Sequence, residues 1–111
     1  MNYGEIYLVD FNKSVGHEYE GKRPGIIIES DNQLKTSNIV TIIALTSKID
    51  NHHHDDILIK MDNRNRLNSD SLIKVNHIES FDRSRFSIKI GIADKETLEK
   101  IKKYLKKHFD L

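Results

Sequence analysis

The sequence contains no cysteine and no tryptophan, and it has a single proline. The absence of cysteine excludes a disulfide framework, a thiol nucleophile and a cysteine metal site. No apolar run approaches the ~20 residues that a membrane-spanning helix needs, and the first residues lack the basic and apolar segments of a secretory signal. These absences lead us to expect a cytoplasmic protein that does not enter a membrane.

The chain also has little net charge, because its 18 Lys and Arg residues nearly balance its 17 Asp and Glu residues over 111 positions. Global charge therefore neither draws the protein to nucleic acid nor keeps it away, and a polyanion site has to be a local arrangement. What is present is 37% hydrophobic and 32% charged residues, a balance typical of a compact domain. We expect one domain over residues 1–111.

Short β-branched runs predict a mainly β protein. Strand-like runs occur at residues 5–11, 25–29, 38–45, 57–61, 71–78 and 85–91. The second and third of these runs are apolar on both faces, which predicts strands covered on both sides. Residues 31–37 are polar and turn-like, and residues 62–69 lack periodicity, which predicts a loop that is mobile without a ligand.

One amphipathic helix is predicted at the C-terminal end, after an N-cap at Asp94. Its apolar stripe consists of Leu98, Ile101, Leu105 and Phe109, with lysines gathered toward its end. Strands followed by a terminal helix predict a small antiparallel β-barrel on which the helix lies as a lid. The lysines are interpreted mainly as a solvated face.

A loop rich in glycine and charge, residues 16–24, is the first candidate for chemistry. It connects the first two predicted strands, where backbone groups and charges can face an anionic ligand. Arg23 is its strongest candidate, because a guanidinium offers a planar fork to two phosphate oxygens and stays charged. The alternative is a surface arginine paired with Glu18 or Glu20.

An ordered series of short motifs covers nearly the whole chain. In order they are Gly-Glu-Ile-Tyr at 4–7, Gly16-x-Glu18-x-x-Gly21-x-Arg23-Pro24, an apolar strand, an apolar run ending in Leu45-Thr46-Ser47, Asp70-Ser71-Leu72-Ile73, Phe81-Asp82 followed by Arg85-Phe86, and the closing helix. This series resembles the MazF/PemK family of bacterial toxins.

The resemblance implies an SH3-like barrel that forms a homodimer and cleaves single-stranded RNA without a metal ion or other cofactor. It also implies a growth-arresting toxin that a cognate antitoxin protein inhibits, and products with a 2′,3′-cyclic phosphate and a 5′-hydroxyl. Two alternatives remain: a toxin of the CcdB type, which shares the fold and binds DNA gyrase, and a catalytically silent RNA-binding barrel. CcdB proteins lack the Gly-x-Glu-x-x-Gly-x-Arg-Pro arrangement.

Three residues are the predicted catalytic groups: Arg23, Thr46 and His17. Arg23 suits stabilisation of the phosphorane charge, and a pKa of roughly 12 or above makes it a poor general base. Thr46 matches the family threonine that works beside this arginine; the alternative is a threonine that ends a strand. His17 has an unperturbed pKa of about 6.5, which suits proton transfer, or it is a loop histidine that binds RNA.

Six further residues are predicted to contact substrate: Glu18, Lys22, Ser47, Lys74, Asn76 and His77. The PemK-like branch carries an arginine and an aspartate where this chain has Lys74 and Asn76, and an amide cannot take a proton at neutral pH. This departure favours the Arg23 and Thr46 scheme. Glu18 orients Arg23 or shapes the loop, and His77 either contacts a base or faces the core.

The run of residues 52–56, His-His-His-Asp-Asp, invites a metal-site interpretation. Consecutive histidines on an extended segment point in alternating directions, and no second ligand cluster supports a closed site. We therefore predict adventitious metal affinity and no functional metal. RNA bases are expected to be read by loops, with stacking on aromatics such as Tyr19.

Overall fold

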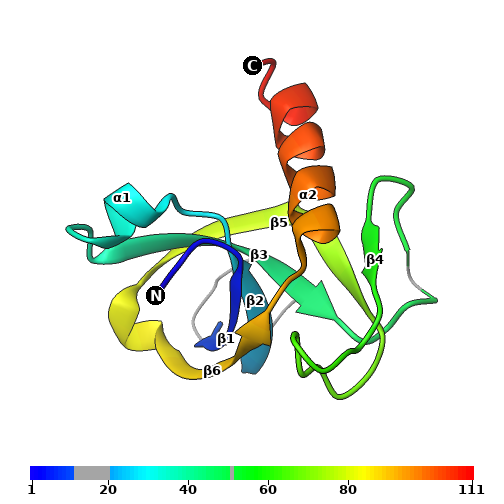
Figure 1. Cartoon of the computed structure of the whole chain (residues 1–111), viewed down its shortest axis with the longest axis horizontal. Helices are drawn as coiled ribbons and strands as arrows, with labels where there is room; N and C mark the ends of the chain where they lie inside the picture. The colour runs from blue at the N-terminus through cyan, green and yellow to red at the C-terminus, as the bar shows by residue number, and fades with distance from the viewer. Residues whose placement is uncertain (12–20, 51) are drawn as a thin grey trace.

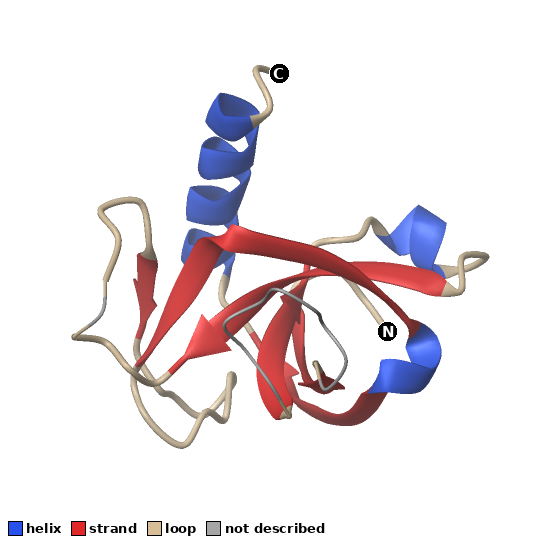
Figure 2. Ribbon diagram, turned by 180° about the vertical axis from the view of Figure 1, so that it is seen from behind, coloured by secondary structure: helices blue, strands red, loops and turns tan. Residues whose placement is uncertain are grey.

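The computed structural model describes residues 1–11, 21–50 and 52–111. Its strands form one antiparallel six-stranded sheet in the order β4-β5-β3-β2-β1-β6. The strands are β1 (Glu5–Asp10), β2 (Lys22–Ile27), β3 (Ile39–Thr46), β4 (Ile57–Ile59), β5 (Ser71–Asp82) and β6 (Phe86–Ile92). The sheet curls into a half-barrel with β4 and β6 at its edges (Figures 1 and 2), which confirms the mainly β prediction.

The central strands are covered on both faces, as their apolar runs predict. Ile26 and Ile27 are adjacent on β2 and fully buried, yet they belong to two different hydrophobic clusters. On β3, Ile43 belongs to the first cluster and Ile42 to the second. Because side chains alternate along a strand, a continuous run of β-branched residues fills both sides of the sheet.

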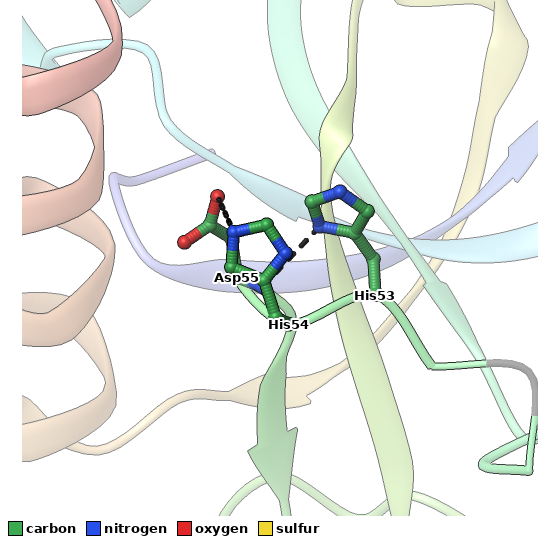
Figure 3. A group of neighbouring side chains, drawn as sticks. All are labelled: His53, His54 and Asp55. Carbon is green, nitrogen blue, oxygen red and sulfur yellow. Dashed lines mark hydrogen bonds and ion pairs between the residues drawn. The ribbon is translucent and has the colours of Figure 1, made fainter.

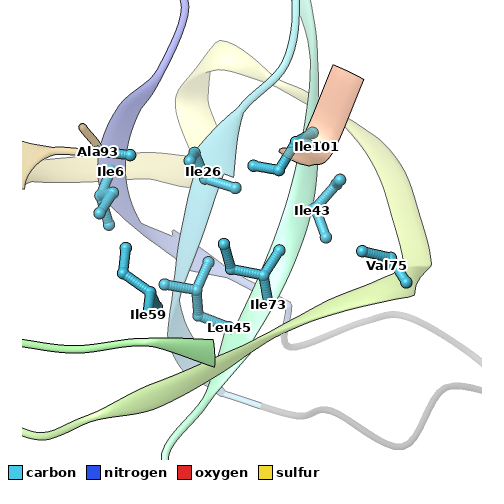
Figure 4. Close-up of a cluster of buried hydrophobic side chains, with 9 residues drawn as sticks. All are labelled: Ile6, Ile26, Ile43, Leu45, Ile59, Ile73, Val75, Ala93 and Ile101. Carbon is cyan, nitrogen blue, oxygen red and sulfur yellow. The ribbon is translucent and has the colours of Figure 1, made fainter. Parts of the chain in front are cut away.

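The C-terminal helix α2 (Lys95–His108) closes the first cluster. Asp94 is its N-cap and accepts a hydrogen bond from the Thr97 N–H, as predicted. Ile101 is fully buried among strand residues, as Figure 4 shows. The stripe does not extend to Phe109, which is 54% exposed, because the last turns of the helix project beyond the sheet (Figure 1).

Some boundaries differ from the sequence prediction. Strand β2 begins at Lys22 rather than Gly25, because β1 pairs with it as far as Asp10 opposite Lys22. Strand β5 continues to Asp82, and a short 3₁₀ helix, η1 (Arg83–Arg85), follows it. The polar segment after β2 forms the one-turn helix α1 (Asp31–Leu34). Across the described residues, no helix has the length and apolar character to cross a membrane.

Candidate active site

A cavity of about 400 Å³ opens at the end of the sheet where β2 begins and β3 ends. It is lined by Leu8, Arg23, Pro24, Leu45, Thr46, Ser47, Arg66, Leu67, Asn68, Ser69, Ser71, Ile88 and Ile90. Strand residues supply most of its apolar wall, and the loop between β4 and β5 contributes three of its polar residues, Arg66, Asn68 and Ser69. A half-open cavity with a few convergent polar groups is the usual form of a ligand site.

Strand register brings the two predicted catalytic residues Arg23 and Thr46 together. The pairing of β2 with β3 ends at Gly25 opposite Ala44, and Arg23 and Thr46 each lie two residues beyond that pair. Arg23 is half-buried, and both residues line the cavity. Residues separated by more than twenty positions in the sequence thus form neighbouring parts of one wall.

The hydroxyl of Thr46 is placed for a donor role. Thr46 is only 6% exposed, and its Oγ1 accepts a hydrogen bond from the Lys48 N–H at 3.2 Å. A hydroxyl has one proton and two lone pairs, so this contact occupies an acceptor position and leaves the proton able to donate. Ser47, the next residue, is exposed and lines the same cavity.

The loop between β4 and β5 is connected by hydrogen bonds among its own residues. Asn65 is 1% exposed; its side chain donates to the Lys60 carbonyl at 2.8 Å and accepts from the N–H groups of Asp62 and Leu67. The Asp62 carboxylate accepts in turn from the N–H groups of Arg64 and Asn65. A buried asparagine satisfied in this way fixes the wall of the cavity.

Gly91 on β6 lets this loop approach the sheet. A Cβ at this position would lie 2.3 Å from the Asn65 carbonyl oxygen and 2.5 Å from that of Arg64. The Ile92 N–H donates to the Arg64 carbonyl at 3.0 Å, so backbone meets backbone here. The loop that joins β4 to β5 therefore also packs against β6, at the opposite edge of the sheet.

Arg66 is the charged cavity residue that the sequence analysis does not predict. It is exposed, it lines the cavity, and its φ of 55° lies in the left-handed region. The only signal in the sequence was a pair of arginines around Asn65, in a segment without periodicity.

Lys74 and Asn76 do not line this cavity. Lys74 Nζ lies 2.6 Å from Asp56 Oδ2, with side chains 10% and 0% exposed, and it forms a buried ion pair. Asn76 Oδ1 accepts a hydrogen bond from the Tyr104 hydroxyl at 3.1 Å, and that hydroxyl lies 3.0 Å from His108 Nδ1. Lys74 therefore contacts the segment before β4, and Asn76 contacts α2.

The other predicted contacts are scattered or lie outside the described residues. Lys22 is exposed and His77 is half-buried, and neither is among the residues that line the cavity. His17 and Glu18 fall outside the described residues. Their predicted roles stay predictions.

The histidine run adopts a turn, which corrects the premise of an extended segment (Figure 3). The Asp56 N–H donates to the His53 carbonyl, and the rings of His53 and His54 lie 4.3 Å apart. One ligand atom from each of His53, His54 and Asp55 lies within 4.8 Å of the others. Asp55 is already engaged by His54 at 3.3 Å and by Lys107 at 3.8 Å.

The pKa of Glu5, on β1, is set by two opposing effects, burial and hydrogen bonding. Burial alone would raise its pKa, but hydrogen bonds from Lys89 and the Asn2 N–H lower the pKa below its usual value. Lys89 Nζ lies 2.6 Å from Glu5 Oε2 and joins β6 to β1. These two strands also carry the cavity residues Leu8, Ile88 and Ile90.

Comparisons with known proteins agree with this architecture. The sequence model of the family described as "PemK-like, MazF-like toxin of type II toxin-antitoxin system" matches residues 2–109. The chain is 30% identical over 100 residues to Endoribonuclease MazF of Staphylococcus saprophyticus, covering 89% of this chain and 83% of that protein.

Solved structures share the fold at lower identity. A crystal structure of MazF from Deinococcus radiodurans superposes with a TM-score of 0.84 at 18% identity, covering 100% of this chain and 97% of the other. A mycobacterial endoribonuclease in complex with its cognate antitoxin superposes with a TM-score of 0.78 at 16% identity, covering 100% and 96%. At these identities, the likeness establishes the fold.

Proposed function

Because this chain belongs to the PemK-like, MazF-like toxin family of type II toxin-antitoxin systems, we propose that it cleaves single-stranded RNA at the Arg23–Thr46 cavity. The observation that carries this proposal is that Arg23 and Thr46 line the same open cavity. A fixed cation and a hydroxyl donor on one wall suit a phosphodiester whose negative charge grows during reaction. The proposed cleavage is sequence-specific and independent of metal.

The proposed reaction is attack by a ribose 2′-hydroxyl on the adjacent phosphorus. A bond forms between the 2′-oxygen and phosphorus while the bond to the 5′-oxygen breaks, which leaves a 2′,3′-cyclic phosphate and a 5′-hydroxyl. One proton leaves the 2′-hydroxyl and one joins the 5′-oxygen, so the step needs no oxidant or further reactant. Water is not consumed in this step.

Arg23 and Thr46 have different parts in this scheme. The guanidinium of Arg23 stabilises the equatorial oxygens of the phosphorane, and it stays charged throughout the pH range of interest. The hydroxyl of Thr46 donates a hydrogen bond to a non-bridging oxygen of the phosphate. Its proton is available for this because Oγ1 acts as the acceptor in its hydrogen bond with the Lys48 N–H. His17, which precedes Arg23 by six positions in the sequence, is the proposed proton-transfer group.

The proposed partners are a cognate antitoxin and a second copy of this chain. Support for the first is that a mycobacterial endoribonuclease of the same fold is in complex with its cognate antitoxin. The homodimer and a cytoplasmic setting follow from family membership alone. Size-exclusion chromatography with light scattering tests the dimer directly.

The test is cleavage of a mixed-sequence RNA transcript in EDTA by the wild type and by Arg23→Ala. We expect cutting by the wild type and a loss of about 10²-fold or more in rate for the variant, with an unchanged circular dichroism spectrum. Arg64→Ala is the matched control, since Arg64 is exposed and does not line the cavity. Full activity of Arg23→Ala refutes the mechanism, and RNA left intact by the wild type refutes the function.

A further inference from the structure

Two arginines among the described residues, Arg83 and Arg85, stabilise the fold through hydrogen bonds to backbone carbonyls. Arg83 donates from Nε to the Ser37 carbonyl at 2.9 Å and also donates to the Leu34 carbonyl, so it fastens η1 to α1. Arg85 donates to the Asp10 carbonyl at 2.9 Å and lies over the Phe81 ring. Each guanidinium is thereby engaged with the protein itself.

Arg66 contrasts with both of them. Its side chain is exposed at the cavity. Within residues 1–11, 21–50 and 52–111, its guanidinium makes no hydrogen bond or ion pair. A guanidinium presents five N–H donors in a rigid plane, and this geometry matches two oxygens of a phosphate. Arg66 therefore brings unused donor capacity to the cavity that already contains Arg23.

The backbone of Arg66 is strained in a way that the loop sustains. Its φ of 55° is unfavourable for a residue with a Cβ, and glycine or asparagine would adopt it at lower cost. The Arg66 N–H donates to the Asp62 carbonyl at 3.0 Å, and the neighbouring Asn65 is locked by its side-chain bonds. A strained residue keeps its conformation only where its neighbours hold it there. Such residues gather at functional sites, and Arg66 lies at a cavity.

We propose that Arg66 binds the backbone phosphate next to the scissile one, so that the cavity is a site for two successive phosphates. This inference rests on the proposed function, since it takes the RNA strand to run from Arg23 across to the loop. Arg23 belongs to a strand and Arg66 to the facing loop, so the two cations come from different walls. A phosphate contact contributes equally to substrate and transition state, so Arg66 is a binding residue.

The experiment uses the full chain and an RNA oligonucleotide that contains the cleavage site mapped on the transcript. A 2′-deoxy sugar at the scissile nucleotide prevents cutting and permits equilibrium binding to be measured by fluorescence anisotropy across a salt series. Arg66→Asn removes the charge and tolerates the left-handed backbone, and Arg66→Lys keeps the charge without the fork. Arg64→Asn, two residues away and outside the cavity, is the matched control.

Arg66→Asn should weaken binding about tenfold and lower the slope of log K against log salt by about 0.7. In cleavage assays, KM should rise by a similar factor while kcat changes less than twofold. Arg66→Lys should restore the salt slope with partial recovery of affinity. Arg66→Gly should raise the melting temperature while binding as weakly as Arg66→Asn, because strain and binding then change in opposite directions.

Several outcomes overturn the proposal. Binding by Arg66→Asn that equals binding by Arg64→Asn shows that Arg66 contacts no phosphate. A loss confined to one base identity shows base reading instead, since phosphate contacts weaken all sequences alike. If the wild type cuts RNA while Arg66→Asn is unaffected, only this inference fails. If the wild type cuts no RNA, the proposed function fails, and binding is measured with a random-sequence 20-mer instead. A smaller slope of log K against log salt for Arg66→Asn than for wild type then still supports the phosphate contact.

Discussion

The cavity at the end of β2 and β3 differs from the polar cluster around Lys74 in how its side chains are satisfied. In the cluster, the Lys74 ammonium pairs with the Asp56 carboxylate, and the Asn76 amide accepts a hydrogen bond from the Tyr104 hydroxyl. At the cavity, the proton of the Thr46 hydroxyl is available for a hydrogen bond. Among the residues that the structure describes, the guanidinium of Arg66 makes no hydrogen bond or ion pair. Groups satisfied by each other stabilise a fold, whereas groups held open are available to a ligand.

This difference bears on two residues that the family resemblance placed among the substrate contacts. Lys74 and Asn76 occupy positions where the PemK-like branch has charged residues, yet here they join β5 to α2 and to the segment before β4. The geometry favours a structural part for both. Stability measurements and RNA cleavage assays on the same variants separate the two possibilities.

Gly91→Ala should have the largest effect, because it breaks the cavity wall. The added Cβ would lie within 2.5 Å of two backbone carbonyl oxygens, and backbone cannot move aside as a side-chain tip can. We expect a loss of about 4 kcal/mol or more in the free energy of unfolding, measured by urea denaturation. Gly21→Ala gives a comparison without a steric clash, since a Cβ there meets nothing within 4 Å, and its φ of 73° should cause only the smaller loss that a left-handed alanine brings. A Gly91→Ala protein of normal stability would show that the loop is not packed against β6.

Lys74→Met tests the cluster. It leaves the fully buried Asp56 carboxylate without its cation, and removal of one partner of a buried pair costs about 3 kcal/mol. The double variant Lys74→Met, Asp56→Asn should recover part of this loss, because the buried charge is then gone. Cleavage per folded molecule should stay within twofold of wild type. A large fall in cleavage with intact stability would instead return Lys74 to the substrate contacts.

The Glu5–Lys89 pair gives a smaller effect that depends on pH. The pKa of Glu5 is lowered in the folded protein, so its stabilisation is complete above the unfolded value near 4.5 and is lost as pH falls through the folded value. Thermal unfolding of Glu5→Gln from pH 7 to pH 3 should therefore begin at a lower melting temperature and decline less steeply than wild type. Parallel curves for the two proteins would contradict a lowered pKa at Glu5.

Tyr104→Phe should have the smallest effect. It removes the hydroxyl that joins Asn76 to His108 on a partly exposed helix face, and a loss of about 0.5 kcal/mol is expected. RNA binding and cleavage should be unchanged. Tyr3→Phe, on another face of the molecule, serves as the comparison for loss of a tyrosine hydroxyl. A marked fall in RNA affinity for Tyr104→Phe would extend the substrate surface to α2.

Much of the fold followed from local patterns. The β-branched runs predicted the central strands because residues that alternate between two buried faces must all be apolar. Asp94 predicted the start of α2 because its carboxylate satisfies an N–H group that the helix leaves open. The ends of β2 and β5 were not predictable in this way, since pairing with β1 and β3 extends them beyond their apolar residues.

The sequence by itself determined the family and nominated Arg23 with Thr46, because the ordered motifs that carry both residues are spelled in the chain. Only the tertiary structure decided that these two residues line one cavity, and that Arg66 joins them from a loop without periodicity. It also decided that Lys74 pairs with Asp56 and that Asn76 contacts Tyr104 of α2. The physical reason is that a motif fixes which chemistry a chain carries, whereas pairing across the sheet and close backbone packing at Gly91 decide which groups meet.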